Sequence, residues 1–341
     1  MLYRRVGDSG LYVSVIGLGE WLTLGGQVDE EGTLRCMKQA YDLGINFFDA
    51  AEKYSTGQLE VALGRAIKRF SWKRSRLVIS TMINYGAANG ETSVNDHTLS
   101  RKHVIEATIA SLKRLDLEYV DIVRAHRPDQ MTPMEETVRA FNYLIENGLA
   151  FYWGTSMWSA DEIAEACRIA KVFGLAAPIV EQPVYNLLDR QKVDGEFHRL
   201  YSKYGMGLVT TSPLKNGVLA ADLTPAQPTS RVRFADMVDG QHGVSANRSP
   251  THENTAYSRK VERLKPVVDR LGVRVAHLAL AWCLKHDNVA SVLIGASHPG
   301  QVVDSVQALR VLSRLTTEVM ADIDRAMRNK PVIDSSHRDR D

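Results

Sequence analysis

The chain has 341 residues, of which 44% are hydrophobic and 24% charged, and its formal net charge at pH 7 is +2. This composition is typical of a soluble globular protein and excludes a disordered chain, a collagen-like repeat and a disulfide scaffold. Acidic and basic residues are interspersed, so electrostatics favour neither a nucleic-acid nor a membrane partner. We expect a small-molecule ligand.

The cysteines and the N-terminal residues indicate the compartment. Cys36, Cys167 and Cys283 are widely separated, and no spacing matches a zinc site or a redox motif, so we expect buried thiols and no metal. The first residues, MLYRRVGDSG, carry charges where a signal peptide needs an apolar core. The longest apolar stretch, residues 275–284, is too short to span a bilayer. These features predict a cytoplasmic protein.

Short apolar runs alternate with amphipathic helical patterns along the chain, after a predicted hairpin of residues 2–6 and 11–14. The predicted strands are Val13–Leu18, Asn46–Asp49, Leu77–Thr81, Asp121–His126, Leu149–Thr155, Ile179–Gln182, Gly207–Thr211 and Val289–Ile294. The predicted helices include Glu31–Leu43, Leu59–Phe70, Arg101–Leu115, Pro133–Glu146, Ala160–Phe173 and Val275–Lys285. Ser100 and Ser159 are predicted N-caps, and glycines at 44, 148 and 174 follow helix ends.

Eight strand–helix units predict a closed parallel barrel, the (β/α)8 TIM barrel. The alternative is a doubly wound Rossmann sheet, but the candidate G-x-G-x-x-G at residues 17–22 has leucine at the third glycine position. We predict one domain, 1–341, with the hairpin capping the bottom and extra C-terminal helices. A long loop at 215–257 is predicted to be a lid, and residues 335–341 a frayed tail.

Catalytic residues of a barrel gather where its strands end. The side chains at those positions are Trp21, Asp49, Tyr54, Met82, His126, Ser156, Gln182, Ser212 and Ser297. An aspartate, a tyrosine and a histidine at one mouth form a set suited to proton transfer. Each also has a structural interpretation: Asp49 could cap the next helix, Tyr54 could pack, and His126 could be a core histidine bonded to a backbone carbonyl.

The segment GINFFDAAEKY, Gly44–Tyr54, resembles the G-x-x-x-x-D-x-A-x-x-Y signature of aldo-keto reductases. Other segments resemble the branch of that family that contains fungal reductases and voltage-gated potassium channel β subunits. They are LSRKHVIEA, LEYVDIV, HRPD, TPMEETVRA, YWGTS, LAWCL and VLIGAS. The resemblance runs in order from about Tyr3 to Pro331 and implies an NADPH or NADP+ cofactor across the barrel mouth.

The resemblance also implies roles for individual residues. Asp49, Tyr54 and His126 match catalytic positions, and the channel subunits have asparagine at the third. The implied substrate pocket is aromatic, with Trp21, Tyr54, Tyr85, His126 and Trp158. The implied cofactor contacts are Trp21, Asp49, Ser156, Gln182, Ser212, Pro213, Leu214, Arg231, Gly295, Ser297, Gln301, Asp304 and Ser305.

Met82 departs from the family pattern, which places a catalytic lysine at the end of V-I-S-T-K where this chain has VISTM. A cation there favours the phenolate and lowers the pKa of the tyrosine. Three explanations stay open: natural repurposing with His126 as the principal proton donor or base, since imidazole titrates near neutral pH; an engineered substitution; or loss of catalysis. Glu20 and Lys53 could form a replacement charge network, and Met82→Lys is predicted to raise turnover.

The sequence therefore predicts an NADPH-dependent oxidoreductase that transfers hydride to or from the carbonyl of an aromatic or polycyclic small molecule. The alternative is a catalytically impaired NADPH-binding regulatory subunit similar to potassium channel β subunits. Relatives in this branch often form tetramers, so the resemblance also implies a homo-oligomer.

Overall fold

The computed structural model describes residues 1–19, 28–86, 93–220, 257 and 259–332. The chain divides into two compact units. Unit 1 comprises Met1–Pro183, Arg199–Thr211 and Asp287–Val306, and unit 2 comprises Val184–His198, Ser212–His286 and Gln307–Asp341.

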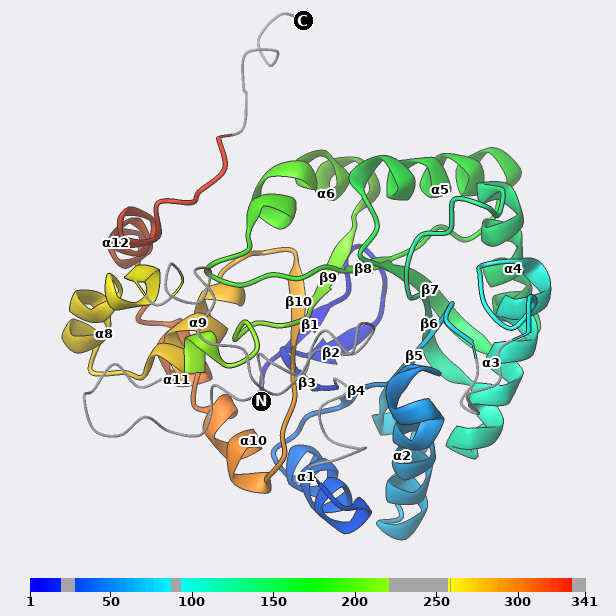
Figure 1. Cartoon of the computed structure of the whole chain (residues 1–341), viewed down its shortest axis with the longest axis horizontal. Helices are drawn as coiled ribbons and strands as arrows, with labels where there is room; N and C mark the ends of the chain where they lie inside the picture. The colour runs from blue at the N-terminus through cyan, green and yellow to red at the C-terminus, as the bar shows by residue number, and fades with distance from the viewer. Residues whose placement is uncertain (20–27, 87–92, 221–256, 258, 333–341) are drawn as a thin grey trace, which may run out of the picture. The chain divides into compact units, whose positions relative to one another are not determined.

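Eight parallel strands of unit 1 close into a barrel in the order β10-β3-β4-β5-β6-β7-β8-β9 (Figure 1). The strands are β3 (Ile16–Leu18), β4 (Phe47–Asp49), β5 (Val78–Ile83), β6 (Val120–Ala125), β7 (Ala150–Ser156), β8 (Val180–Gln182), β9 (Gly207–Thr210) and β10 (Val289–Ile294). The closed order confirms the TIM barrel and excludes the open Rossmann sheet.

Helices follow the strands, and Figure 1 shows α2 to α5 succeeding one another around the outside of the barrel. They are α1 (Glu30–Asp42), α2 (Gln58–Arg69), α3 (Arg101–Leu115), α4 (Met134–Glu146), α5 (Ala160–Phe173), α6 (His198–Tyr204) and α10 (Pro299–Val306), with the short turns η2 (Tyr54–Gly57) and η3 (Arg74–Arg76). The Ser100 and Ser159 side chains cap α3 and α5, as predicted. The three predicted C-terminal glycines have positive φ, as a left-handed cap requires.

The predicted hairpin is present, as β1 (Tyr3–Arg5) paired with β2 (Tyr12–Ser14). The prediction of one strand over Val13–Leu18 is wrong, because the chain changes partners at Val15. The Val15 N–H donates to Leu2 of the hairpin, and its carbonyl accepts from Val292 of the barrel. The hairpin closes the lower end of the barrel with an apolar cluster of Val6, Val13, Phe47, Val78, Ile122, Val180, Val209, Ala290 and Leu293.

Unit 2 contains the predicted additional C-terminal helices. Its elements are α8 (Lys265–Leu271), α9 (Val275–Cys283), α11 (Leu309–Leu312), α12 (Thr317–Met327), a π-helical turn η4 (Lys192–Glu196) and η5 (Val218–Ala220). Arg190 joins two of them, bonding Asp194 at 2.5 Å and Asp324 at 2.7 Å. Most of the predicted lid, 221–256, and the tail, 333–341, lie outside the described residues. None of the described helices is long and apolar enough to cross a membrane.

Candidate active site

The candidate catalytic residues lie at or next to the carboxyl ends of adjacent strands. Asp49 is the last residue of β4, Met82 lies in β5, and His126 follows β6. All three side chains are buried. The Tyr54 ring lies edge-on to His126, with 5.7 Å between ring centroids, and Tyr85 lies edge-on to it at 5.0 Å. The structure therefore brings a tyrosine and the histidine together as the sequence predicts, with a second aromatic ring beside them.

Asp49 is held from two sides inside the barrel. Its Oδ1 forms an ion pair with Nη2 of Arg124, and its Oδ2 accepts a hydrogen bond of 3.1 Å from the Gln182 amide. Ser156 Oγ lies 3.2 Å from the Oε1 atom of the same amide. Gly19 is needed for this packing, because a Cβ there would come within 2.7 Å of the Asp49 Cβ. The carboxylate thus belongs to a buried polar chain and does not simply cap a helix.

Arg124 is the residue that sequence reasoning missed. It lies in β6 directly opposite Met82 of β5 in the strand register, and its side chain is fully buried. Side chains two positions apart in a strand share a face, so Arg124 and His126 both point to the same side of β6. An arginine within a buried strand was the available signal. Of its guanidinium nitrogens, Nε and Nη1 have no hydrogen-bond partner within the described part of the chain.

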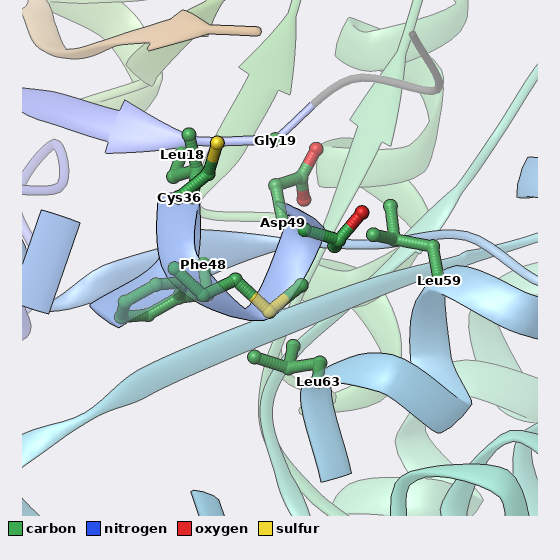
Figure 2. A pocket seen from close by; sticks show the side chains of 9 residues that line it. Leu18, Gly19, Cys36, Phe48, Asp49, Leu59 and Leu63 are labelled. Atoms are coloured by element: carbon green, nitrogen blue, oxygen red, sulfur yellow. The ribbon is translucent and has the colours of Figure 1, made fainter. Parts of the chain in front are cut away.

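An apolar pocket lies against Asp49 and gives it a low-dielectric wall (Figure 2). The pocket is lined by Leu18, Gly19, Thr33, Cys36, Met37, Phe48, Asp49, Leu59 and Leu63. Burial raises the pKa of the Cys36 thiol to about 11, so this cysteine is protonated at neutral pH. Charges interact more strongly where water is excluded. The pocket therefore increases the dependence of the Asp49 carboxylate on its cationic partner.

The surroundings of His126 favour its neutral form. Burial is the main cause of a pKa well below its usual value of 6.5. Neighbouring cations add to the shift; they are Arg127, Arg124 and Lys53. The Nδ1 atom of His126 has no hydrogen-bond partner among the residues that the structure describes. Burial among positive charges opposes protonation of His126, so its role as a proton donor or base near neutral pH stays a prediction.

Lys53 lies against Tyr85, with Nζ 3.9 Å from the ring centroid. Burial, followed by the charge of Arg127, lowers its pKa. The predicted charge network of Lys53 with Glu20 is untested, because Glu20 lies outside the described residues. The cation that pairs with Asp49 in the structure is Arg124.

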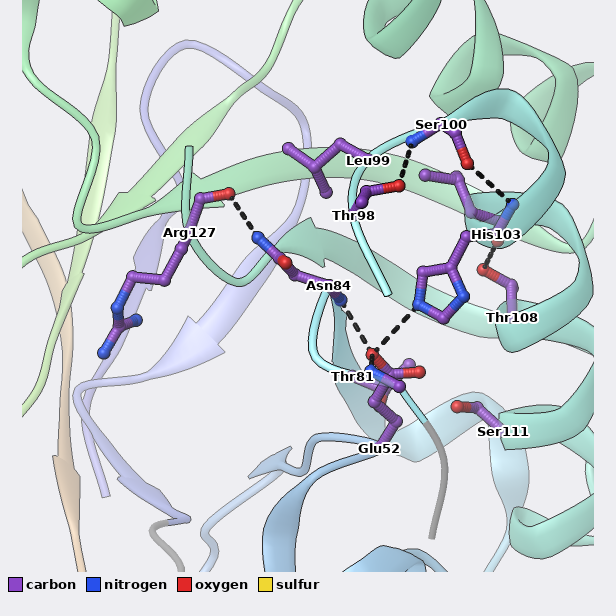
Figure 3. A network of polar contacts seen from close by, with 12 residues as sticks. Glu52, Thr81, Asn84, Thr98, Leu99, Ser100, His103, Thr108, Ser111 and Arg127 are labelled. Atoms are coloured by element: carbon purple, nitrogen blue, oxygen red, sulfur yellow. Dashed lines mark hydrogen bonds and ion pairs between the residues drawn. The ribbon is translucent and has the colours of Figure 1, made fainter. Parts of the chain in front are cut away.

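A second buried carboxylate, Glu52, organises the loops around the site (Figure 3). Its Oε1 accepts from the backbone N–H groups of Asn84 at 2.7 Å and Gly86 at 3.0 Å, and lies 3.4 Å from Nε2 of His103 in α3. The Asn84 side chain donates in turn to the Arg127 carbonyl at 2.9 Å. Glu52 therefore links the segments that carry Tyr54, Tyr85 and His126. Sequence reasoning missed this role too, although Glu52 lies within the signature segment.

The cofactor positions implied by the resemblance fall in several places. Ser297 lies just before α10 and Gln301 in its first turn, with Asp304 and Ser305 further along the helix and Gly295 just after β10. Three donors converge there on Gln301 Oε1: the Ser297 N–H at 2.7 Å, the Ser297 hydroxyl at 3.1 Å and the His298 N–H at 3.3 Å.

The remaining predicted cofactor and substrate residues lie in unit 2, outside the described residues, or fully buried in the fold. Ser212, Pro213 and Leu214 belong to unit 2. Trp21 and Arg231 lie outside the described residues, and Trp158 is fully buried. Their assignment to the cofactor or the substrate stays a prediction.

Comparison with known proteins identifies the family. A model described as "Aldo/keto reductase family" matches residues 15–328. The chain is also 45% identical over 338 residues to a "Probable voltage-gated potassium channel subunit beta" of Oryza sativa subsp. japonica and to one of Arabidopsis thaliana. Each alignment covers 99% of this chain and 100% of the relative. The barrel, the mouth residues and these matches together show that the chain belongs to the aldo-keto reductase family and is a close homologue of the plant channel β subunits.

Proposed function

We propose that the chain is an NADPH-binding regulatory subunit of a voltage-gated potassium channel, with slow hydride transfer retained at the barrel mouth. The full-length match to two plant β subunits carries this proposal. Met82 in place of the catalytic lysine is consistent with a protein in which cofactor occupancy matters more than fast turnover. We further expect four chains to assemble, as the resemblance implies, which light scattering of the purified protein would measure.

The described residues fit a nicotinamide dinucleotide at both ends. At the start of α10, three donors meet on one side-chain oxygen, an arrangement that a phosphate oxygen can replace. At the other end, the buried Ser156 and Gln182 offer a hydroxyl and an amide beside Asp49. Groups of this kind suit a carboxamide. These two donor sets support the proposal that the chain holds the phosphates at one end and the nicotinamide at the other.

When bound, NADPH supplies a hydride to a substrate carbonyl carbon. The protein must then provide hydrogen bonds and a proton at the carbonyl oxygen. Tyr54 would donate the proton from its hydroxyl group. Its ring lies beside His126, so both side chains could contact the same carbonyl oxygen. His126, whose surroundings favour its neutral form, would act as a hydrogen-bond donor that polarises the carbonyl rather than as an acid. Tyr85 and Tyr54 supply aromatic walls suited to an aryl substrate.

A titration with NADPH tests the cofactor assignment. We expect binding with micromolar or tighter affinity, seen as a change in nicotinamide fluorescence. Ser297→Asp places a negative charge where a phosphate is expected and should weaken binding about tenfold, equivalent to about 1.4 kcal/mol. The matched control is Ser202→Asp on the exposed side of α6, which should bind like the unmodified chain. Absence of binding, or equal affinity in both variants, would contradict the proposal.

A second candidate, a carbonyl reductase with multiple turnover, is favoured by the cation that the structure places beside Asp49. Two measurements distinguish the candidates. Co-expression with a voltage-gated potassium channel should yield a stable complex in detergent if the chain is a channel subunit. Steady-state reduction of 4-nitrobenzaldehyde at more than about one turnover per second, within the usual range for enzymes, with no channel complex, would favour the reductase.

A further inference from the structure

Met82 stands on β5 where the family pattern has a positively charged lysine. The adjacent strand β6 carries a positive charge, that of Arg124, at the same level. Met82 and Arg124 are register partners in the parallel pair β5–β6. Both side chains are fully buried. Thr81, the residue before Met82, points outward to Glu60 at 2.5 Å, so Met82 points into the barrel. The two side chains are thus neighbours in the same interior layer.

Asp49 uses Arg124 as its cationic partner in that layer. An ionised carboxylate so deeply buried is costly unless it is paired. Without Arg124, the negative charge of Asp49 would lie beside Met82 and the apolar pocket with no cation to balance it. Arg124 supplies the opposite charge. It also lies close enough to His126 to help lower the pKa of that imidazole.

We propose that Arg124 is a positioning residue that replaces the missing lysine, so that the cation of the site has moved from β5 to β6 while its contact with Asp49 is kept. The inference rests on the proposed hydride transfer. Arg124 acts through Asp49 and His126. Its Nε and Nη1 atoms are buried and lack partners among the described residues, so Asp49 is the principal contact of the guanidinium there. Met82 in turn fills the lysine's volume without adding a second cation.

This exchange reverses an expectation from the sequence. With Arg124 in place, Met82→Lys would put two cations beside one carboxylate, so it should give less than a threefold gain in rate. Arg124→Met should leave Asp49 without a cation and lower the single-turnover oxidation of bound NADPH by 4-nitrobenzaldehyde about 100-fold, within the usual range for acid–base assistance. NADPH affinity should change by less than about threefold.

The double variant Met82→Lys, Arg124→Met is the decisive test. Arg124→Met should shift the pH dependence of the rate. In the double variant, the lysine should restore the rate to within about tenfold of the unmodified chain and restore the original pH dependence. The melting temperature should fall by about 5 °C in Arg124→Met and recover in the double variant. Rescue of the rate and of its pH profile separates a role in the reaction from a purely structural one.

Arg114→Met is the matched control, because Arg114 forms a comparable ion pair with buried Glu60 on the outer side of β5. It should lower the melting temperature and leave the pH profile unchanged. The proposal is overturned if Met82→Lys raises the rate equally with and without Arg124, if Arg124→Met reacts at the original rate, or if the double variant fails to fold. If the unmodified chain does not bind NADPH, the proposed function is contradicted. The melting temperatures of the variants would still test whether Arg124 replaces the lysine as the partner of Asp49.

Discussion

Two buried carboxylates, each paired with an arginine, lie on opposite sides of the same strand wall, and their surroundings differ. Outside the barrel, Glu60 of α2 accepts from Arg114 at 2.6 Å and from the Thr81 hydroxyl at 2.5 Å. Inside, Asp49 pairs with Arg124. Arg114 also donates to a serine of its own helix at 2.9 Å, whereas Arg124 has two nitrogens without partners in the described structure. The outer pair is thus reinforced by further hydrogen bonds, whereas the inner pair has two buried guanidinium nitrogens that no described residue contacts.

Glu60→Met should show the largest effect on stability, because it leaves the half-buried Arg114 without its counter-ion. We expect the free energy of unfolding to fall by about 3 kcal/mol, since removing one member of a buried pair strands the other. Urea denaturation monitored by circular dichroism measures it. NADPH affinity of the folded variant should stay unchanged. A large loss of affinity would show that the outer pair also serves the site and would break the comparison.

His126 should make the inner region sensitive to acid. Its folded pKa lies below the unfolded value of 6.5, so the unfolded chain takes up a proton first as the pH falls. Its contribution to stability is therefore constant above pH 6.5 and is lost below that pH, towards its folded pKa. We expect a loss of about 1.4 kcal/mol per pH unit between pH 6 and 5 that His126→Gln abolishes. Equal slopes in the two proteins would mean that folding does not lower the pKa of His126.

The fold was predictable because barrel strands are short apolar runs separated by helices with caps, and those signals are local. The division of the run Val13–Leu18 was not predictable, because both pieces are apolar and only the partner strands decide where the chain turns from hairpin to barrel. Arg124 was missed for a similar reason. Its alternation with His126 is visible in the sequence, but its register with Met82 depends on how parallel strands separated by a helix are staggered.

Lys53→Met should have the smallest effect. It removes the contact with the Tyr85 ring, worth about 0.5–1 kcal/mol, and one of the charges that depress the pKa of His126. The NMR titration of the His126 ring should therefore move to higher pH. The control is Lys203→Met, which removes a comparable contact with Tyr204, 5.1 Å from the ring, elsewhere in unit 1. A titration displaced equally by both variants would contradict a local origin.

The hairpin beneath the barrel decides from which end a ligand can approach the site. Because Val6 and Val13 close the lower end with apolar contacts, and because the interior of such a barrel is a packed core, a ligand can approach only the opposite rim, where the strands end. Reactant, product and water must all pass the same rim, so departure of one is a condition for entry of the next. The sealed end is correspondingly a place where changes such as N-terminal fusions can be tolerated without altering the chemistry.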